Sequence, residues 1–217
     1  MDLSLDIKSA PITIKKKKLP LTNGTTTIKE ILPMDLTECL DRYTSVETLS
    51  AEDYRCRKCE SGQEAKKRLS LNRLPPVVPV HLKRFSHSKS LKESSKVDTK
   101  VRFPLTLDLV PYVSAPKKSK NNPLTNGHGG ANKAGDEASA DKLLPPDYPL
   151  SSPIYELSSV VVHKGKIDNG HYVSYSKQQH EWFRFDDSMV VQVDEREVLA
   201  AEAYMLFYVG RGFDVPS

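Results

Sequence analysis

The sequence has few cysteines and no long hydrophobic run. Only three cysteines occur in 217 residues, which argues against a disulfide scaffold and favours a reducing compartment. Apolar runs such as residues 77–82 and 160–162 are far shorter than the ~20 residues of a membrane helix. No basic and then apolar leader opens the chain. We therefore expect a soluble intracellular protein that makes no membrane contact.

Neither positively nor negatively charged residues are in large excess. The chain carries 32 lysine and arginine residues against 28 acidic ones, a formal net charge of +4. Lysines gather at residues 15–18 and 117–120, and such clusters serve as nuclear addresses or phosphate-binding patches less often than as solvated loops. Aromatic and basic residues are not interleaved along the chain. A nucleic-acid or nucleosome binder is therefore the weakest of the function classes.

The chain does contain a series of short strand patterns. Period-two alternation predicts strands at residues 2–7 and 99–109, and a β-branched run predicts another at 77–85. The class we expect is α+β with a mainly antiparallel sheet and short helices. Further strands are predicted at residues 158–163, 171–176, 181–186 and 204–209.

Two short helices are predicted. Asp35 and Glu38 have the spacing of a capping box, and apolar side chains recur on one helical face from Leu36 to about Tyr43. A second short helix is predicted near residues 195–202.

Two segments interrupt the pattern of strands. Residues 8–27 are polar and basic and contain two prolines, which predicts a loop insertion. Residues 114–153 are too poor in apolar side chains to offset their ordering entropy, which predicts a disordered insertion. Native domains rarely begin within a strand, so we expect residues 1–217 to be part of a domain rather than a whole one.

The strongest functional signal lies in two neighbouring strand patterns that carry His171 and Asp186. Folding the intervening hairpin about residues 178–179 places these two residues directly opposite each other. Opposed residues share one face with Cβ atoms ~4.5–5.5 Å apart, so the carboxylate is expected to accept the Nδ1 hydrogen of the imidazole. Asp187 is expected to point to the other face unless a bulge intervenes.

A histidine held by a carboxylate presents its second ring nitrogen as a general base for a cysteine or serine nucleophile. Gly170 favours this role, because a missing side chain lets an extended substrate backbone come close. The alternative is a half-buried hairpin in which His171 and Asp186 merely pair, and spacing alone leaves it open.

The cysteines indicate metal chemistry more than catalysis. Cys56 and Cys59 have the spacing of half a tetrahedral zinc site, and no second pair of this spacing exists in the chain. Cys39 falls on the apolar face of the predicted helix, which favours a buried, inert thiol over a third ligand or a nucleophile.

The order of these motifs resembles the C-terminal part of the catalytic domain of the ubiquitin-specific proteases, a family of cysteine deubiquitinases. The resemblance implies a papain-like fold, of which this chain would form the palm and part of the fingers, without the thumb. The matching stretches are residues 2–7, 40–43, 54–59, 74–85, 101–105, 170–172, 182–187 and 204–208.

The resemblance also implies roles for the candidate residues. His171 would be the general base and Asp186 the third member of the triad, while Asp187 would support the histidine or the oxyanion. Tyr172 and Trp182 would flank the cleft that admits the ubiquitin tail.

The resemblance assigns the cysteine pair to a structural zinc. Cys56 and Cys59 would be the second cysteine pair of the zinc-bearing fingers, so the site would be incomplete in this chain. The family's segment of the type Gly-Asn-Thr-Cys, which holds the nucleophile, is not present either. The chain would then be the C-terminal part of a deubiquitinase or, alternatively, a truncated, inactive module that binds ubiquitin or a partner.

Within the family, residues 39–43 and 96–105 look most like the histone deubiquitinase of the SAGA transcriptional coactivator complex. This resemblance implies ubiquitinated histone H2B as substrate, SAGA-type coactivator subunits and nucleosomes as partners, and a location in the nucleus and also in the cytoplasm.

Overall fold

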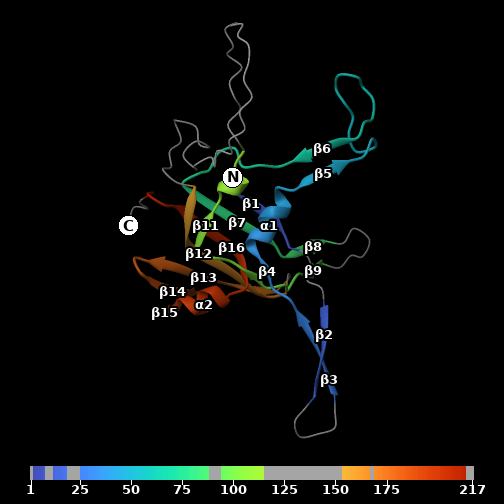
Figure 1. Ribbon diagram of the computed structural model, residues 1–217. Helices are drawn as coiled ribbons and strands as arrows, with labels where there is room; N and C mark the ends of the chain where they lie inside the picture. The colour runs from blue at the N-terminus through green and yellow to red at the C-terminus, as the bar shows by residue number, and fades with distance from the viewer. Residues whose placement is uncertain are drawn as a thin grey trace, which may run out of the picture.

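The computed structural model describes residues 2–7, 12–18, 25–87, 94–114, 153–166 and 169–213. The body of the protein is an eight-stranded sheet with strand order β1-β7-β16-β12-β13-β14-β15, in which β11 also pairs with β12 (Figure 1). The strands are β1 (Leu3–Asp6), β7 (Val77–Lys83), β11 (Thr106–Asp108), β12 (Ile154–Gly165), β13 (Gly170–Gln178), β14 (Glu181–Asp186), β15 (Met189–Val193) and β16 (Ala203–Gly210).

Antiparallel pairing dominates this sheet, and only the pairing of β1 with β7 is parallel. The prediction of an α+β protein with a mainly antiparallel sheet is therefore confirmed. Four two-stranded ladders stand beside the sheet. They pair β2 (Ile12–Lys18) with β3 (Thr25–Ile31), β4 (Met34–Asp35) with β10 (Val101–Arg102), β5 (Val46–Leu49) with β6 (Ala65–Arg68), and β8 (Phe85–His87) with β9 (Ser94–Lys96).

Two short α-helices and one 3-10 turn complete the described fold: α1 (Leu36–Tyr43), α2 (Glu195–Ala200) and η1 (Val110–Tyr112). The predicted helix at 36–43 is confirmed at both ends, and the Asp35 backbone N–H donates to Glu38 Oε2 at 3.4 Å, as in a capping box. Neither α-helix is long enough or apolar enough to span a membrane, and the same holds for every helix in the described ranges.

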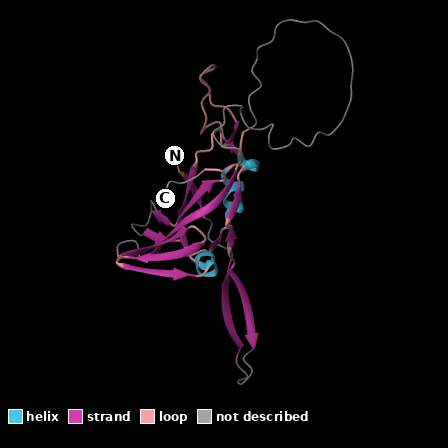
Figure 2. Cartoon of the chain, turned by 90° about the vertical axis from the view of Figure 1, so that its left-hand side faces the viewer, coloured by secondary structure: helices cyan, strands magenta, loops and turns pink. Residues whose placement is uncertain are grey.

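The hydrophobic core joins the sheet to both helices. Leu36, Cys39 and Leu40 of α1 and Val198 of α2 are buried in the same cluster as the inward residues of the sheet. Leu206, in the middle of β16, is fully buried. The helices therefore cover the buried face of the sheet (Figure 2).

A buried arginine joins three segments of the chain. Arg84 is only 1 % exposed and lies between β7 and β8. Its Nε donates to the Ala203 carbonyl at 2.6 Å, and its Nη1 donates to the carbonyls of Val97 and Thr99 at 3.0 and 2.9 Å. Charged donors make strong hydrogen bonds, so this guanidinium fixes the start of β16 against the segment that follows β9.

The prediction of one continuous strand over residues 99–109 is wrong. The structure forms β10 and β11 instead, with Pro104 between them. The alternation is right, because Val101, Phe103 and Leu107 are all buried. Proline removes a backbone donor, so the segment changes its pairing partner from β4 to β12 while keeping its inward side chains.

The predicted loop at residues 8–27 is also wrong where this segment is described. β2 and β3 form a hairpin that projects from the body (Figure 2). The strand pattern Ile12-Thr13-Ile14 is hidden in the sequence by the lysines that follow it. The predicted disordered insertion at 114–153 lies almost wholly outside the described residues, and the domain limits stay a prediction.

We predict that Arg84→Ala lowers the free energy of unfolding by about 3 kcal/mol, because two buried carbonyls and one partly buried carbonyl lose a charged donor. Urea unfolding of the 217-residue chain measures this change. The matched control is Arg102→Ala, which removes an exposed ion pair with Asp35 at 2.8 Å and should cost about 1 kcal/mol or less. Equal losses in the two variants would contradict the bridging role of Arg84.

Candidate active site

The β13–β14 hairpin carries the candidate catalytic residues. Its two strands pair with Gln178 opposite Glu181 and Tyr175 opposite Arg184. The predicted register was therefore wrong by two residues, since it placed Tyr175 opposite Trp182. A shift of two keeps every side chain on its predicted face, so His171 and Asp186 still share a face.

His171 and Asp186 are diagonal neighbours rather than an opposed pair. Continuing the register by one step places Asp186 opposite Val173, two residues from His171. The right-handed twist of the sheet brings such diagonals within reach of long side chains. His171 Nε2 lies 2.5 Å from Asp186 Oδ1. The prediction that Nδ1 makes this contact is wrong, because the contacting nitrogen is Nε2.

Asp187 lies on the same side as the histidine, although the sequence predicts the other face. Its φ of 50° is in the left-handed region, which turns the chain from β14 into β15. One nitrogen or oxygen atom of each of His171, Asp186 and Asp187 lies within 4.8 Å of the other two. The structure thus brings the three predicted catalytic residues together.

The pair shifts the protonation of both partners. The hydrogen bond to Asp186 raises the pKa of His171, and the negative charges of Asp186 and Asp187 add to this effect. The same hydrogen bond lowers the pKa of Asp186. The carboxylate therefore stays ionised, and it orients the imidazole and makes it more basic. The side chains of His171 and Asp186 are 44 % and 29 % exposed, so the ring is accessible to a reacting group.

Helix α2 braces the hairpin from the core side. Glu197 accepts a hydrogen bond from Arg184 Nη1 at 2.9 Å and one from the Tyr175 hydroxyl at 3.3 Å. Tyr175 and Arg184 are directly opposed on β13 and β14. Sequence reasoning missed this support, and it missed β15 altogether, because residues 189–191 are exposed and do not alternate.

The predicted substrate-binding residues fall into different environments. Gly170 begins β13, and Tyr172 is 55 % exposed, so both are accessible next to His171. Trp182 is only 3 % exposed and lies in the core near the far end of β14. Its burial makes Trp182 a packing residue, and its contact with substrate stays a prediction to which the structure lends no support.

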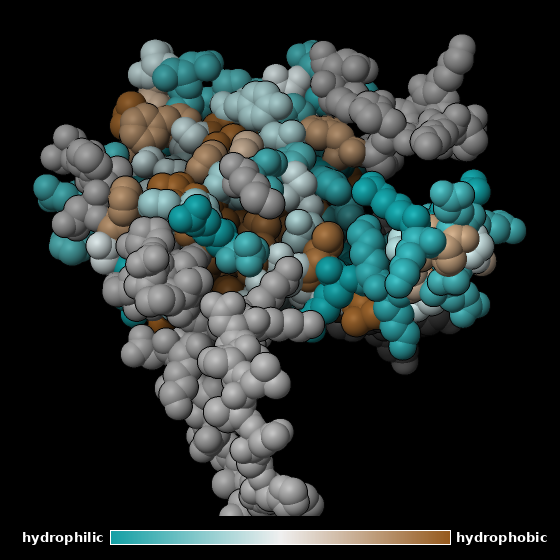
Figure 3. All heavy atoms as spheres, turned by 90° about the horizontal axis from the view of Figure 1, so that it is seen from above, coloured by the Kyte–Doolittle hydropathy of each residue, from teal (hydrophilic) through white to brown (hydrophobic). Residues whose placement is uncertain are grey.

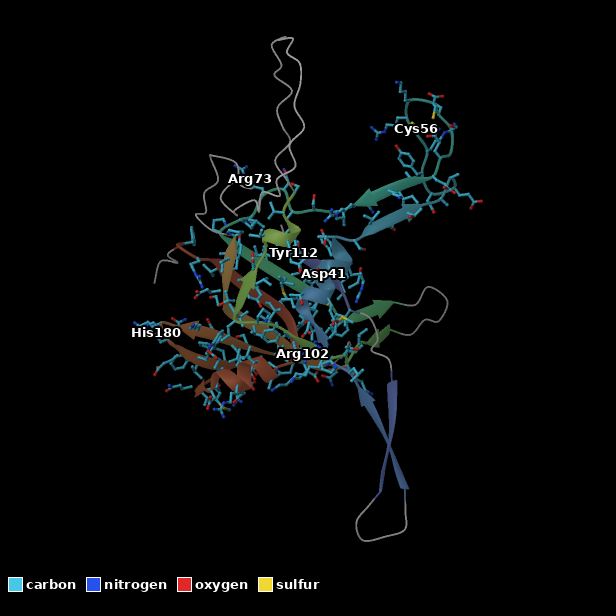
Figure 4. All side chains as sticks on the ribbon, in the orientation of Figure 1. Asp41, Cys56, Arg73, Arg102, Tyr112 and His180 are labelled. Carbon is cyan, nitrogen blue, oxygen red and sulfur yellow. The ribbon has the colours of Figure 1, made fainter. Side chains whose placement is uncertain are left out.

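The cysteine pair lies at the tip of the β5–β6 arm, on the opposite side of the body from His180 of the β13–β14 hairpin (Figure 4). The knuckle is closed by hydrogen bonds from Cys56 N to Ser61 O and from Glu60 N to Cys56 O, at 3.0 and 2.8 Å. A hydrogen bond from Ser61 lowers the pKa of Cys59, which favours the thiolate that binds metal. The arm presents a largely hydrophilic surface (Figure 3).

The third cysteine is unsuited to catalysis. Cys39 is 1 % exposed, burial raises its pKa, and its Sγ lies 3.4 Å from Met34 Sδ. The expectation of a buried, inert thiol is therefore confirmed.

An apolar pocket of about 510 Å³ lies between β1, α1 and the segment 70–76. None of its lining residues belongs to the candidate site.

The sequence matches the family model for ubiquitin carboxyl-terminal hydrolases over residues 16–208. The chain belongs to this family. Ubiquitin carboxyl-terminal hydrolase 22 of Homo sapiens is 36 % identical over 188 residues, which cover 86 % of this chain and 31 % of that protein. Ubiquitin carboxyl-terminal hydrolase 8 of Saccharomyces cerevisiae is 35 % identical over 212 residues, covering 97 % and 35 % respectively.

Comparison with solved structures leads to the same family. The SAGA Ubp8/Sgf11/Sus1/Sgf73 DUB module bound to ubiquitin aldehyde contains a chain that is 31 % identical, with a TM-score of 0.64 over 98 % of this chain and 36 % of that one. The predicted papain-like, sheet-dominated α+β fold of the ubiquitin-specific proteases is thereby confirmed. The chain spans about a third of the length of the relatives that it matches.

We predict that NMR titration of the 217-residue chain gives His171 a pKa above its ordinary 6.5, and that Asp186→Asn removes most of this rise. Asp187→Asn is the matched control and should remove less, because Asp187 acts by charge alone. A larger effect of Asp187→Asn would mean that it, and not Asp186, holds the imidazole.

The same two shifts set the pH range in which the pair stabilises the fold. The raised pKa of His171 gives a contribution that is complete below 6.5 and is lost as pH rises through the folded value. The lowered pKa of Asp186 gives one that is complete above 3.8 and is lost as pH falls through the folded value.

Proposed function

We propose that this chain is the C-terminal part of the catalytic domain of a thiol-dependent deubiquitinase, which cleaves ubiquitin from protein conjugates. The observation that carries the proposal is the short hydrogen bond between His171 Nε2 and Asp186 Oδ1, on an accessible ring whose Nδ1 has no hydrogen-bond partner among the described residues. A histidine in this state is oriented by one nitrogen and reacts through the other.

In the proposed reaction, His171 Nδ1 takes the proton of a cysteine thiol. The thiolate attacks the carbonyl carbon of ubiquitin's terminal glycine, and the imidazolium returns the proton to the departing amine. Water, activated by the same nitrogen, then hydrolyses the thioester. Asp186 keeps its negative charge throughout and stabilises the imidazolium.

The nucleophilic cysteine is supplied by a part of the domain outside these 217 residues. Cys39 is buried, and Cys56 lies on the opposite side of the body from His180 of the β13–β14 hairpin, with Cys59 in the same turn as Cys56 (Figure 4). Asp187 supports the histidine by its charge or assists the oxyanion. Gly170 and Tyr172 adjoin His171 along β13 but lie on the other face of the sheet, and their proposed role is to contact the ubiquitin tail.

The knuckle fits half of a structural zinc site. Two thiols leave one tight turn, in which Glu60 has a φ of 53°, and a lowered pKa favours the thiolate form of Cys59. Zinc would be held by Cys56 and Cys59 together with two ligands from outside this chain, and it would stiffen the tip of the arm.

The proposed setting is chromatin. The relatives include a Ubp8 chain in structures with Sgf11, Sus1 and Sgf73, one of them bound to monoubiquitin. By this similarity we propose SAGA-type coactivator subunits as partners, ubiquitinated histone H2B as substrate, nucleosomes as the larger target, and a nuclear location. The alternative function is an inactive module that holds ubiquitin or a partner.

We predict that His171→Ala in the native protein, purified from its own cells, abolishes release of a fluorophore from the C-terminus of ubiquitin. Ubiquitin binding should stay nearly unchanged, because the ring acts on the reacting atoms and not on the globular part of ubiquitin. Absence of hydrolysis by the native protein itself, with binding intact, would favour the binding module instead.

A pair of carboxylate variants separates the two acidic residues in the same assay. Asp186→Ala should reduce the rate more than Asp187→Ala, because Asp186 alone makes the hydrogen bond to the imidazole. The reverse order would show that Asp187 orients the histidine during turnover.

A further inference from the structure

The space beside Gly170 is filled by the side chain of His163. A Cβ atom added to Gly170 would overlap Nε2 and Cε1 of this imidazole and would lie 2.9 Å from its Cδ2. Real Cβ atoms do not approach other atoms so closely, so a larger residue must displace the ring or the strand. Gly170 is therefore required by a neighbouring side chain, which is a different reason from the approach of a substrate.

The imidazole of His163 is buried among aromatic rings, and the residue also lines a cavity of about 330 Å³. The residue is only 5 % exposed. Its ring packs edge-on against Phe85 and Tyr172, with centroid distances of 5.1 and 4.8 Å, and lies 6.5 Å from the ring of Tyr204. Its Nδ1 is buried without a hydrogen-bond partner among the described residues. Packing, rather than hydrogen bonding of this nitrogen, holds the ring in place.

Strand pairing sets this contact next to the catalytic pair. On β12 and β13, His163 is opposite Tyr172 and Lys164 is opposite His171. Gly170 precedes Tyr172 by two residues, so it is the diagonal neighbour of His163 on one face of the sheet. His171 meets its own diagonal neighbour on the opposite face. Two consecutive residues of β13 are thus held from opposite sides.

We propose that His163 is a positioning residue: its imidazole packs against the backbone of Gly170 and sets the main-chain position from which His171 reaches Asp186. The role of His163 in catalysis rests on the proposed function. The steric contact itself does not, because it is a property of the folded chain.

The test follows the His171 imidazole by nitrogen-15 NMR in the 217-residue chain and needs no turnover. Gly170→Ala should lose the upward shift of the His171 pKa, because the added methyl collides with the buried His163 ring and pushes the main chain of β13 away from it. His163→Ala alone should lose part of the shift, because nothing then packs against Gly170. The double variant Gly170→Ala/His163→Ala should regain it, because the methyl enters the space that the ring vacates.

The matched control is Gly170→Ala/His81→Ala. His81 belongs to the same aromatic cluster, 5.0 Å from Tyr204, but is not among the atoms nearest to the added methyl. Its removal should restore nothing. If Gly170→Ala alone fails to fold, recovery of the folded spectrum by His163→Ala and not by His81→Ala gives the same support.

Three results would overturn the inference. An unchanged His171 pKa in Gly170→Ala would show that the methyl is accommodated and that the glycine serves another purpose, such as the approach of substrate. Failure of His163→Ala to rescue, or equal rescue by His81→Ala, would show that the ring does not position His171. None of these results bears on whether the native protein hydrolyses ubiquitin, so the two proposals fail separately.

Discussion

The hydrogen-bonded pairing of β12 with β13, and of β13 with β14, is the constraint on which the candidate site depends. The first ladder puts Lys164 opposite His171 and His163 opposite Tyr172. The second ladder puts Asp186 one step diagonal to His171. Because the side-chain period of a strand is two, a slip of one residue in either ladder would move the histidine or the aspartate to the other face and break the pair. The geometry of the site therefore depends on the register of both ladders.

Contacts away from the reacting atoms support the strands around the site. Arg84 ties the start of β16, the neighbour of β12, to the segment 97–99 through three carbonyls. Glu197 of α2 bonds to Tyr175 and Arg184 and so joins the helix to both strands of the hairpin. The site itself remains partly open to solvent, as the proposed role of His171 in a deubiquitinase requires.

The sequence predicted correctly those features that depend on neighbouring residues alone. The capping box and apolar spacing at 35–43 predicted α1 correctly, because a short helix depends on its own residues. The face shared by His171 and Asp186 was also predictable, since an even error in register preserves faces. The register was not predictable, because the polar residues 177–180 do not reveal which pair turns, and Gln179 adopts a φ of 54° without being glycine. The diagonal offset between His171 and Asp186 decides that Nε2 makes the hydrogen bond, and packing across β12 decides that His163 lies against Gly170. Neither feature can be read from the spacing of residues in the sequence.

The most direct test of the account treats the native protein, as its cells make it, with ubiquitin that carries a thiol-reactive electrophile at its C-terminus, and locates the adduct by peptide mass. The account predicts one adduct on a cysteine other than Cys39, Cys56 and Cys59, and its loss in the His171→Ala variant. A folded native protein that forms no adduct, or one that reacts at Cys59, would contradict the assignment of His171 and Asp186 as the base and orienting acid of a deubiquitinase.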